Sequence, residues 1–221
     1  MPYARVLLAA LCALAVAGVT GCGTTGHKPA PKKSLAEKSV RTAPPVGPKA
    51  EPPVNSAARA DYERALGALK AGREREAEQA LLAMGRAYPD LSGPKANLGI
   101  LYFRLGKIEE AEQALAQAIK INPERPAYYN QLGIVYRAHG RFGDARKAYE
   151  QALRLDPDYS KAHLNIGILY DLYLNDLTKA LHHYQRYQQL HNPEDKQVAK
   201  WIVDLNQRTR KIDKSGKKEN G

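Results

Sequence analysis

The sequence lacks a recognisable catalytic constellation. No glycine-rich phosphate loop, nucleophile elbow or paired-carboxylate motif occurs among its 221 residues. The histidines include no pair at i and i+4 with acidic support, which is the spacing of a helical zinc site. His182 and His183 are adjacent, so on a helix they point about 100° apart, and we interpret them as surface or interhelix residues. We therefore expect no enzyme, no metal site and no cofactor.

Cysteine is also scarce. The chain has two, Cys12 and Cys22, and Cys12 lies in an N-terminal segment that we expect to be removed. The mature chain would then hold one cysteine, which excludes an intramolecular disulfide even in an oxidising compartment.

The apolar run from Val6 to Val19 is too short for a comfortable transmembrane helix, which needs about 20 residues. It follows one arginine and has the length of a signal-peptide core, so residues 1–21 are predicted to be a signal peptide. The run ends in Val-Thr-Gly-Cys at 19–22, which resembles the bacterial lipobox. This resemblance implies cleavage after Gly21 and acylation of Cys22 on its sulfur and its new amino group. The alternative is an ordinary secretory signal that contains a cysteine.

The resemblance also implies a location in the bacterial cell envelope. Gly23 stands where enteric-type bacteria place the aspartate of an inner-membrane retention signal. We therefore expect a lipid-anchored protein of the outer membrane that faces the periplasm.

Residues 22–57 are rich in Pro, Lys and Ala and poor in large apolar side chains, which predicts a disordered, extended tether. The net charge of the chain is +11, of which residues 23–53 and 207–221 each carry +4. With Arg5 set aside, residues 54–206 carry only +2, so the charge does not indicate a nucleic-acid partner for the folded part. The basic tails, including a disordered tail over 212–221, could contact anionic lipid or cell wall, or could only keep the tether soluble.

The middle of the chain repeats itself. The segment NQLGIVYRAHGRFGDARKAYEQALRLDP at 130–157 matches segments 95–123 and 163–193, and more weakly 61–89. Pro89, Pro123 and Pro157 stand 34 residues apart, and a fixed period of this length indicates stacked supersecondary units. We place four units in 58–193. They span 58–91, 92–125, 126–159 and 160–193.

Each unit is predicted to form two helices. Tyr129, Leu132 and Tyr136 recur at helical spacing on one face, and Gly140 suits the left-handed residue after the first helix. Glycines inside helices cost about 1 kcal/mol each against alanine, so we expect them to allow close approach of the paired helix. These interior glycines are Gly99, Gly133 and Gly167, and the small residues expected opposite them are Ala111, Ala145 and Ala180.

These residues resemble the tetratricopeptide repeat (TPR) family. The third unit carries nearly the full pattern: Tyr129, Leu132, Gly133, Tyr136, Gly140, Ala145, Tyr149, Ala152 and Pro157. The resemblance implies an all-α protein, a right-handed α-solenoid of about four helix hairpins. An apolar stripe in 194–211 predicts a capping helix that covers the last unit. Trp201 in that stripe is interpreted as a core residue, with a binding hot spot as the alternative.

The resemblance further implies that the first helix of each unit lines a concave surface that binds a partner. Leu66, Ile100, Ile134 and Ile168 would form an apolar ribbon edged by charges, which suits an amphipathic helix or an extended peptide. The alternative is that these residues pack neighbouring helices or are covered by the cap or tether. The candidate groove residues are Tyr62, Leu66, Leu69, Ile100, Phe103, Arg104, Asn130, Ile134, Arg137, Lys161, Leu164, Ile168, Asp171 and Leu172.

We expect a membrane-anchored protein-protein interaction scaffold or assembly factor of the cell envelope. One alternative is similar to the pilotins, TPR lipoproteins that assist secretin assembly in type IV pilus systems. Another is similar to TPR lipoproteins that act as adaptors for cell-wall hydrolases. A remote alternative is a peptidoglycan-binding module.

Overall fold

A computed structural model describes residues 55–191 and 195–219, with side chains as far as residue 211. The predicted signal peptide, Cys22 and nearly all of the predicted tether lie outside these residues. Every regular element within the described ranges is an α-helix. The helices are α1 (Ser56–Lys70), α2 (Glu74–Ala87), α3 (Ser92–Arg104), α4 (Ile108–Ile121), α5 (Pro126–Ala138), α6 (Phe142–Leu155), α7 (Ser160–Leu172), α8 (Leu177–Leu190) and α9 (Lys196–Glu219).

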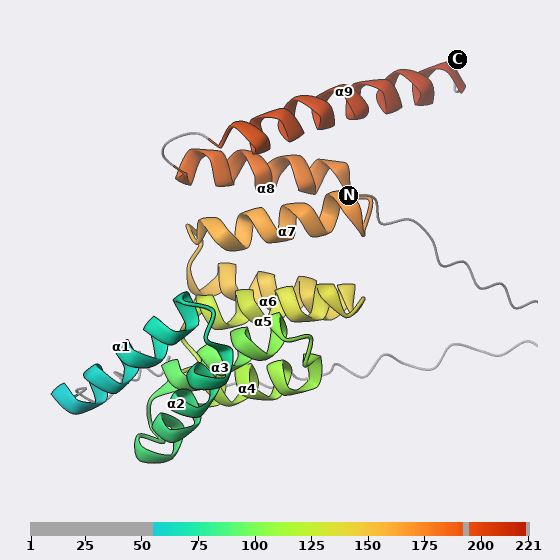
Figure 1. Cartoon of the computed structure of the whole chain (residues 1–221). Coiled ribbons are helices and arrows are strands. Elements are labelled where there is room, and N and C mark those ends of the chain that lie inside the picture. Colours follow the sequence, from blue (N-terminus) through green and yellow to red (C-terminus); the bar gives the residue numbers. More distant parts are fainter. Residues whose placement is uncertain (1–54, 192–194, 220–221) are drawn as a thin grey trace, which may run out of the picture. The chain divides into compact units, whose positions relative to one another are not determined.

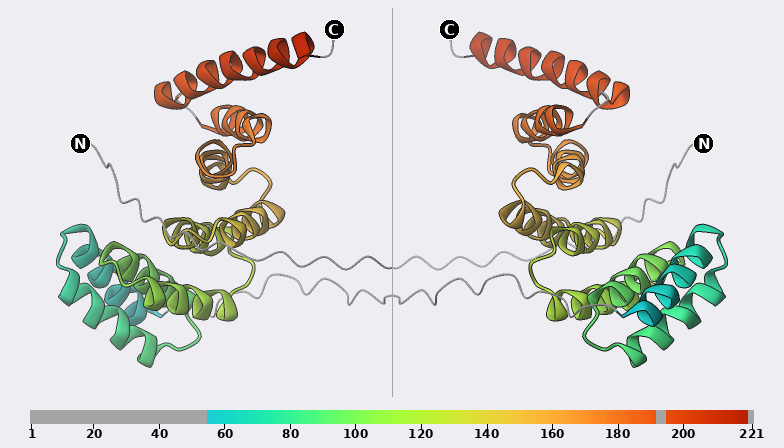
Figure 2. Two further views of the ribbon diagram at one scale, coloured as in Figure 1. Left: turned by 90° about the vertical axis from the view of Figure 1, so that its right-hand side faces the viewer. Right: turned by 90° about the vertical axis from the view of Figure 1, so that its left-hand side faces the viewer.

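The helices pack in chain order as four hairpins. The closest packing joins α1 with α2, α3 with α4, α5 with α6 and α7 with α8, and each hairpin then contacts the next through α2–α3, α4–α5 and α6–α7. Helix α9 packs on α8 in the same way (Figures 1 and 2). This arrangement confirms the predicted all-α solenoid of helix hairpins.

The interior glycines allow the paired helices to approach closely. A Cβ atom on Gly133 would lie 2.5 Å from Cε1 of Tyr149, and one on Gly167 would lie 2.7 Å from the ring of Tyr184. In the second hairpin, a Cβ atom on Gly99 would lie 2.6 Å from Cγ of Leu115. The expected close approach is therefore confirmed, but each glycine faces a large side chain of the paired helix. The opposing alanines at 111, 145 and 180 are themselves fully buried.

The loop inside each of the first three hairpins turns on a glycine in the left-handed region, Gly72, Gly106 or Gly140, with φ between 70° and 76°. This confirms the prediction for Gly140. In the fourth hairpin Asn175 takes that conformation, with φ 53°. Asparagine tolerates it better than other side-chain-bearing residues, because its short amide can bond locally.

Helix α9 is longer than predicted. We expected a capping helix over 194–211 and a disordered tail over 212–221, but the helix continues to Glu219. The added segment is rich in lysine, a good helix former, and one interior glycine costs only about 1 kcal/mol. At the other end, Asp195 caps the helix by accepting hydrogen bonds from the backbone N–H groups of Gln197 (2.9 Å) and Val198 (3.2 Å). The bond from Val198 is the main cause of the lowered pKa of Asp195.

The cap packs through its apolar stripe. Val198 and Leu205 are 1% and 0% exposed, and both belong to the largest buried cluster, with Tyr149, Ile166, Leu169 and Tyr184. Trp201 is half-buried, with its ring centroid 5.4 Å from that of Tyr184. The structure thus places Trp201 against the core, as the first interpretation of this residue expects. Within residues 55–191 and 195–219, no helix has both the length and the apolar character that crossing a bilayer requires.

Candidate functional site

The candidate groove follows the first helices of the hairpins. Helix α5 contacts both α3 and α7, so these first helices form a row. Most of the predicted groove residues are half-buried along that row, while Arg104, Lys161 and Leu172 are exposed. The half-buried ones are Tyr62, Leu66, Leu69, Ile100, Phe103, Ile134, Arg137, Leu164, Ile168 and Asp171.

The apolar ribbon has two kinds of members. Ile134 and Ile168 are half-buried and pack against the large cluster around Tyr149 and Tyr184. Leu66 and Ile100 are also half-buried, but they stand apart from the core clusters of the described chain. The alternative interpretation, that the ribbon packs neighbouring helices, therefore applies in part to the third and fourth units. The half of the ribbon at α1 and α3 is the more available surface.

Asn130 does not line an open groove. Its side chain is 1% exposed, and its Oδ1 accepts a hydrogen bond of 2.9 Å from the amide of Asn165 on the next first helix. Tyr62 has a similar place two junctions earlier, between α1 and α3, where its hydroxyl accepts a hydrogen bond of 2.5 Å from the amide of Asn97. Asn130 is thus a correction to the predicted site, because a buried amide requires a partner and finds it on the adjacent unit.

Asp171 is paired with the capping helix. Its carboxylate accepts a hydrogen bond of 3.0 Å from the guanidinium of Arg208, and its side chain is only 10% exposed. Arg208 also reaches Asp204, 3.4 Å away on its own helix. Asp171 is therefore not a free acidic edge of the groove. Sequence reasoning missed this contact because the two residues lie 37 positions apart.

The other charged residues of the predicted groove are cationic. Lys70, Arg104 and Lys161 are exposed, and Arg104 lies 3.7 Å from Glu74 in a loose ion pair. Arg137 lies beside Tyr149, where burial raises the pKa of the phenol to about 12 and the guanidinium opposes that rise. The row thus combines half-buried apolar side chains with a basic edge.

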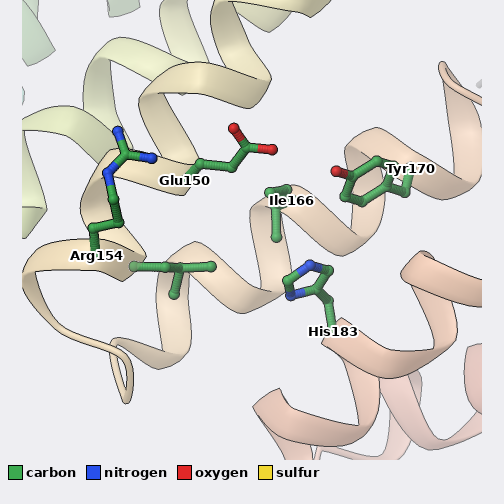
Figure 3. Close-up of a pocket in the computed structure, with 6 residues that line it drawn as sticks. Glu150, Arg154, Ile166, Tyr170 and His183 are labelled. Carbon is green, nitrogen blue, oxygen red and sulfur yellow. The ribbon is translucent and has the colours of Figure 1, made fainter. Parts of the chain in front are cut away.

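A second feature is a shallow pocket of about 310 Å³ between α6, α7 and α8. Glu150, Arg154, Ile166, Tyr170 and His183 surround it, together with one leucine (Figure 3). The imidazole of His183 stacks on Tyr170 with 5.8 Å between ring centroids and an interplanar angle of 6°.

His183 at this pocket forms a partly buried pair with His163. The two Nδ1 atoms are 3.0 Å apart, and Nε2 of His163 is 3.0 Å from the carbonyl oxygen of Pro157. A carbonyl can only accept, so Nε2 of His163 carries its proton, and Nδ1 of His183 donates to Nδ1 of His163. Burial lowers the pKa of both imidazoles, that of His183 to about 4. Both rings are therefore neutral at pH 7 and serve as a polar link between α7 and α8.

The described side chains include no cluster of three or more His, Cys, Asp or Glu residues that could hold a metal ion. The row of first helices offers an apolar surface to a partner. The polar side chains described above, Asn130, Asp171 and the pair of histidines, mostly hold the helices together.

Comparisons with known proteins agree with this geometry. A family model described as tetratricopeptide repeat matches residues 96–158 and 130–195. A search among curated protein sequences gives no significant match.

Three solved structures illustrate the likeness in fold. An O-GlcNAc transferase mutant of Thermobaculum terrenum is 25% identical over 60% of this chain, with a TM-score of 0.55, and this chain spans only 26% of it. PilF of Pseudomonas aeruginosa is 20% identical, with a TM-score of 0.64 over 70% of each chain. The first TPR domain of Spaghetti (RPAP3), solved with an HSP90 peptide, is 22% identical, with a TM-score of 0.51 over 54% of this chain and 95% of its own. The helix hairpins, the glycine contacts and the family match together show that the repeats of this chain, over residues 96–195, belong to the tetratricopeptide repeat family.

Proposed function

We propose that the chain is a non-enzymatic scaffold of the bacterial cell envelope that binds a helix or extended peptide of a partner protein along its first helices. The tetratricopeptide repeat fold supports a role in protein-protein interaction. The observation that carries the proposal is the row of half-buried apolar residues, open at Leu66 and Ile100, beside the cationic Lys70 and Arg104. Such a row fits an amphipathic helix whose apolar face is flanked by acidic residues.

Replacing Ile100 with aspartate is expected to raise the Kd of the partner by about tenfold to a hundredfold. The substitution removes an apolar contact worth about 1.5 to 3 kcal/mol and places a charge against the apolar side of the ligand. The partner is first captured in intact cells through a photoreactive residue at position 66, and its affinity for purified variants is then measured by titration calorimetry.

Val203 provides the matched control. It is 56% exposed on α9, away from the row, so Val203→Asp is expected to keep the Kd within about twofold. Far-ultraviolet circular dichroism should show the same helix content in both variants. Equal affinity of Ile100→Asp and the parent chain would contradict the proposed site. Ile134→Asp is a poorer probe, because Ile134 also packs on the core.

The membrane anchor is a separate part of the proposal. It rests on the lipobox-like residues 19–22 in the sequence. Cys22→Ser is expected to release the protein from the membrane fraction, since several acyl chains anchor durably and their loss leaves no such anchor. Fractionation of cells followed by immunoblotting measures this change. Persistence in the membrane fraction after a high-salt wash, which screens electrostatic binding to the bilayer surface, would contradict lipidation if the signal peptide has been removed.

The finer role follows from the identity of the captured partner. A pilotin-like function is supported by the combination of tetratricopeptide hairpins with a lipobox-like sequence, and it requires a secretin subunit as the crosslinked protein. A cell-wall hydrolase would instead indicate the adaptor role. Pelleting of the protein with isolated peptidoglycan would favour the glycan-binding alternative.

A further inference from the structure

The fourth hairpin exposes three consecutive large apolar side chains, at the last residue of α7 and in the loop that follows it. Leu172, Tyr173 and Leu174 are 66%, 46% and 37% exposed. Among the described side chains, Val203 is the one other large apolar residue that is exposed to this extent. The corresponding loops of the first three hairpins, at 71–73, 105–107 and 139–141, each end in a glycine followed by a basic residue. The fourth loop thus departs from its sister loops in composition as well as in length.

This apolar loop is held in a defined shape. Tyr173 packs on Phe142 of the preceding hairpin, with 4.6 Å between ring centroids. Asp176 caps α8 by accepting a bond of 3.1 Å from the backbone N–H of Lys179, and Asn175 supplies the left-handed residue. The exposure of Leu172 and Leu174 is therefore built into the turn.

The basic half of α9 reaches the same edge. Arg208 contacts Asp171, the residue before Leu172, with an N–O distance of 3.0 Å. Arg210 and Lys211 follow as exposed residues, and α9 continues to Glu219, about 16 Å beyond Arg208 at 1.5 Å per residue. Figure 1 shows the α7–α8 loop and the C-terminal end of α9 on the same side of the stacked helices. The sequence gives 207–221 a net charge of +4.

We propose that this edge, the loop 172–174 together with the C-terminal half of α9, binds the surface of an anionic lipid bilayer. Leucine side chains enter the boundary between headgroups and acyl chains, and tyrosine favours that boundary because it has an apolar ring and a polar hydroxyl. Arginine and lysine beside an inserted loop add attraction to anionic headgroups. The nearby carboxylates Asp171 and Asp204 share the single guanidinium of Arg208, and with both counted the segment keeps a net charge of +2.

Hydrogen exchange of the full chain, reconstituted in vesicles without a protein partner, tests this contact separately from partner binding in the groove, although Leu172 is also one of the predicted groove residues. We compare vesicles of phosphatidylcholine with vesicles that also contain phosphatidylglycerol. Amides in 172–176 are expected to exchange about tenfold more slowly with the anionic lipid, because contact with the bilayer suppresses local opening. The loops at 71–73 and 105–107 serve as internal controls and are expected to keep their exchange rates.

The double variant Leu172→Ser/Leu174→Ser is expected to lose this protection, whereas Val203→Ser, which removes an equally exposed apolar residue elsewhere, keeps it. Circular dichroism verifies that both variants fold. Equal exchange in the two kinds of vesicle would overturn the proposal. Protection that grows with the density of the protein in phosphatidylcholine alone would also overturn it and would assign the edge to a second copy of the chain.

Discussion

Replacing Gly133 with alanine is expected to lower the free energy of unfolding by about 2 kcal/mol. The new Cβ atom would lie 2.5 Å from the ring of Tyr149, which is fully buried and cannot swing away. Overpacking of this kind costs about 3 kcal/mol, and the better helix propensity of alanine returns about 1 kcal/mol. Unfolding in urea, followed by circular dichroism, measures the difference.

Gly67 is the matched control for this substitution. It lies in α1, and a Cβ atom there would meet nothing within 4 Å. Gly67→Ala is therefore expected to stabilise the protein by up to about 1 kcal/mol. In a Tyr149→Ala background, Gly133→Ala should no longer destabilise, because the two changes are coupled through one contact. If Gly133→Ala behaved like Gly67→Ala, the close packing of α5 against α6 would be wrong.

Acid is expected to weaken the fourth hairpin by about 3 kcal/mol between pH 6.5 and pH 4. Burial lowers the pKa of His183 to about 4, whereas histidine in an unfolded chain titrates near 6.5. The unfolded state then binds the proton more readily, so stability is complete above pH 6.5 and falls until the pH reaches about 4. The lowered pKa of His163 acts in the same direction. Urea titrations at several pH values, followed by the fluorescence of Trp201, measure this loss.

His183→Gln is the test of this assignment. Glutamine can still donate a hydrogen bond toward His163 but does not titrate, so the slope of stability against pH should flatten. The exposed His139 gives the control, and His139→Gln is expected to leave the slope unchanged. The neighbouring charges that contribute are His182, Lys179 and Arg186, all on α8, and Asp158 in the turn before α7. They remain in both variants, so an unchanged slope in His183→Gln would count against the buried pair.

Local signals made the hairpins predictable. Gly140 marks a left-handed turn, Gly133 marks a close helix contact, and Pro157 marks the end of a helix. Each of these signals is carried by one residue, and their recurrence along the chain gave the boundaries of the repeat units. The contacts that removed Asn130 and Asp171 from the open surface of the candidate site could not be predicted, because they join residues that are far apart in the sequence. Asn130 meets Asn165 across 35 positions, and Asp171 meets Arg208 across 37.

The length of α9 was underestimated for another reason. Basic residues at 208–211 suit the end of a helix, but the same residues are good helix formers and allow continuation. The exposure of the side chains at 172–174 was also not predicted, because a leucine or tyrosine in a repeat is ordinarily expected to be buried. Its departure from the glycine-basic pattern of the other loops was the available signal.

Helix α9 packs at the end of the stacked hairpins as the first helix of a further hairpin would, and this packing allows the domain to change in length. Helix α9 meets α8 as α7 meets α6, and each hairpin contacts its immediate neighbours. A duplicated copy of 126–159 could therefore be inserted before the fourth hairpin without disturbing either terminus. The proposed groove would then gain one more first helix, while the proposed lipid-binding edge on the fourth hairpin and α9 kept its own residues. The length of the groove and the contact with lipid could therefore evolve separately.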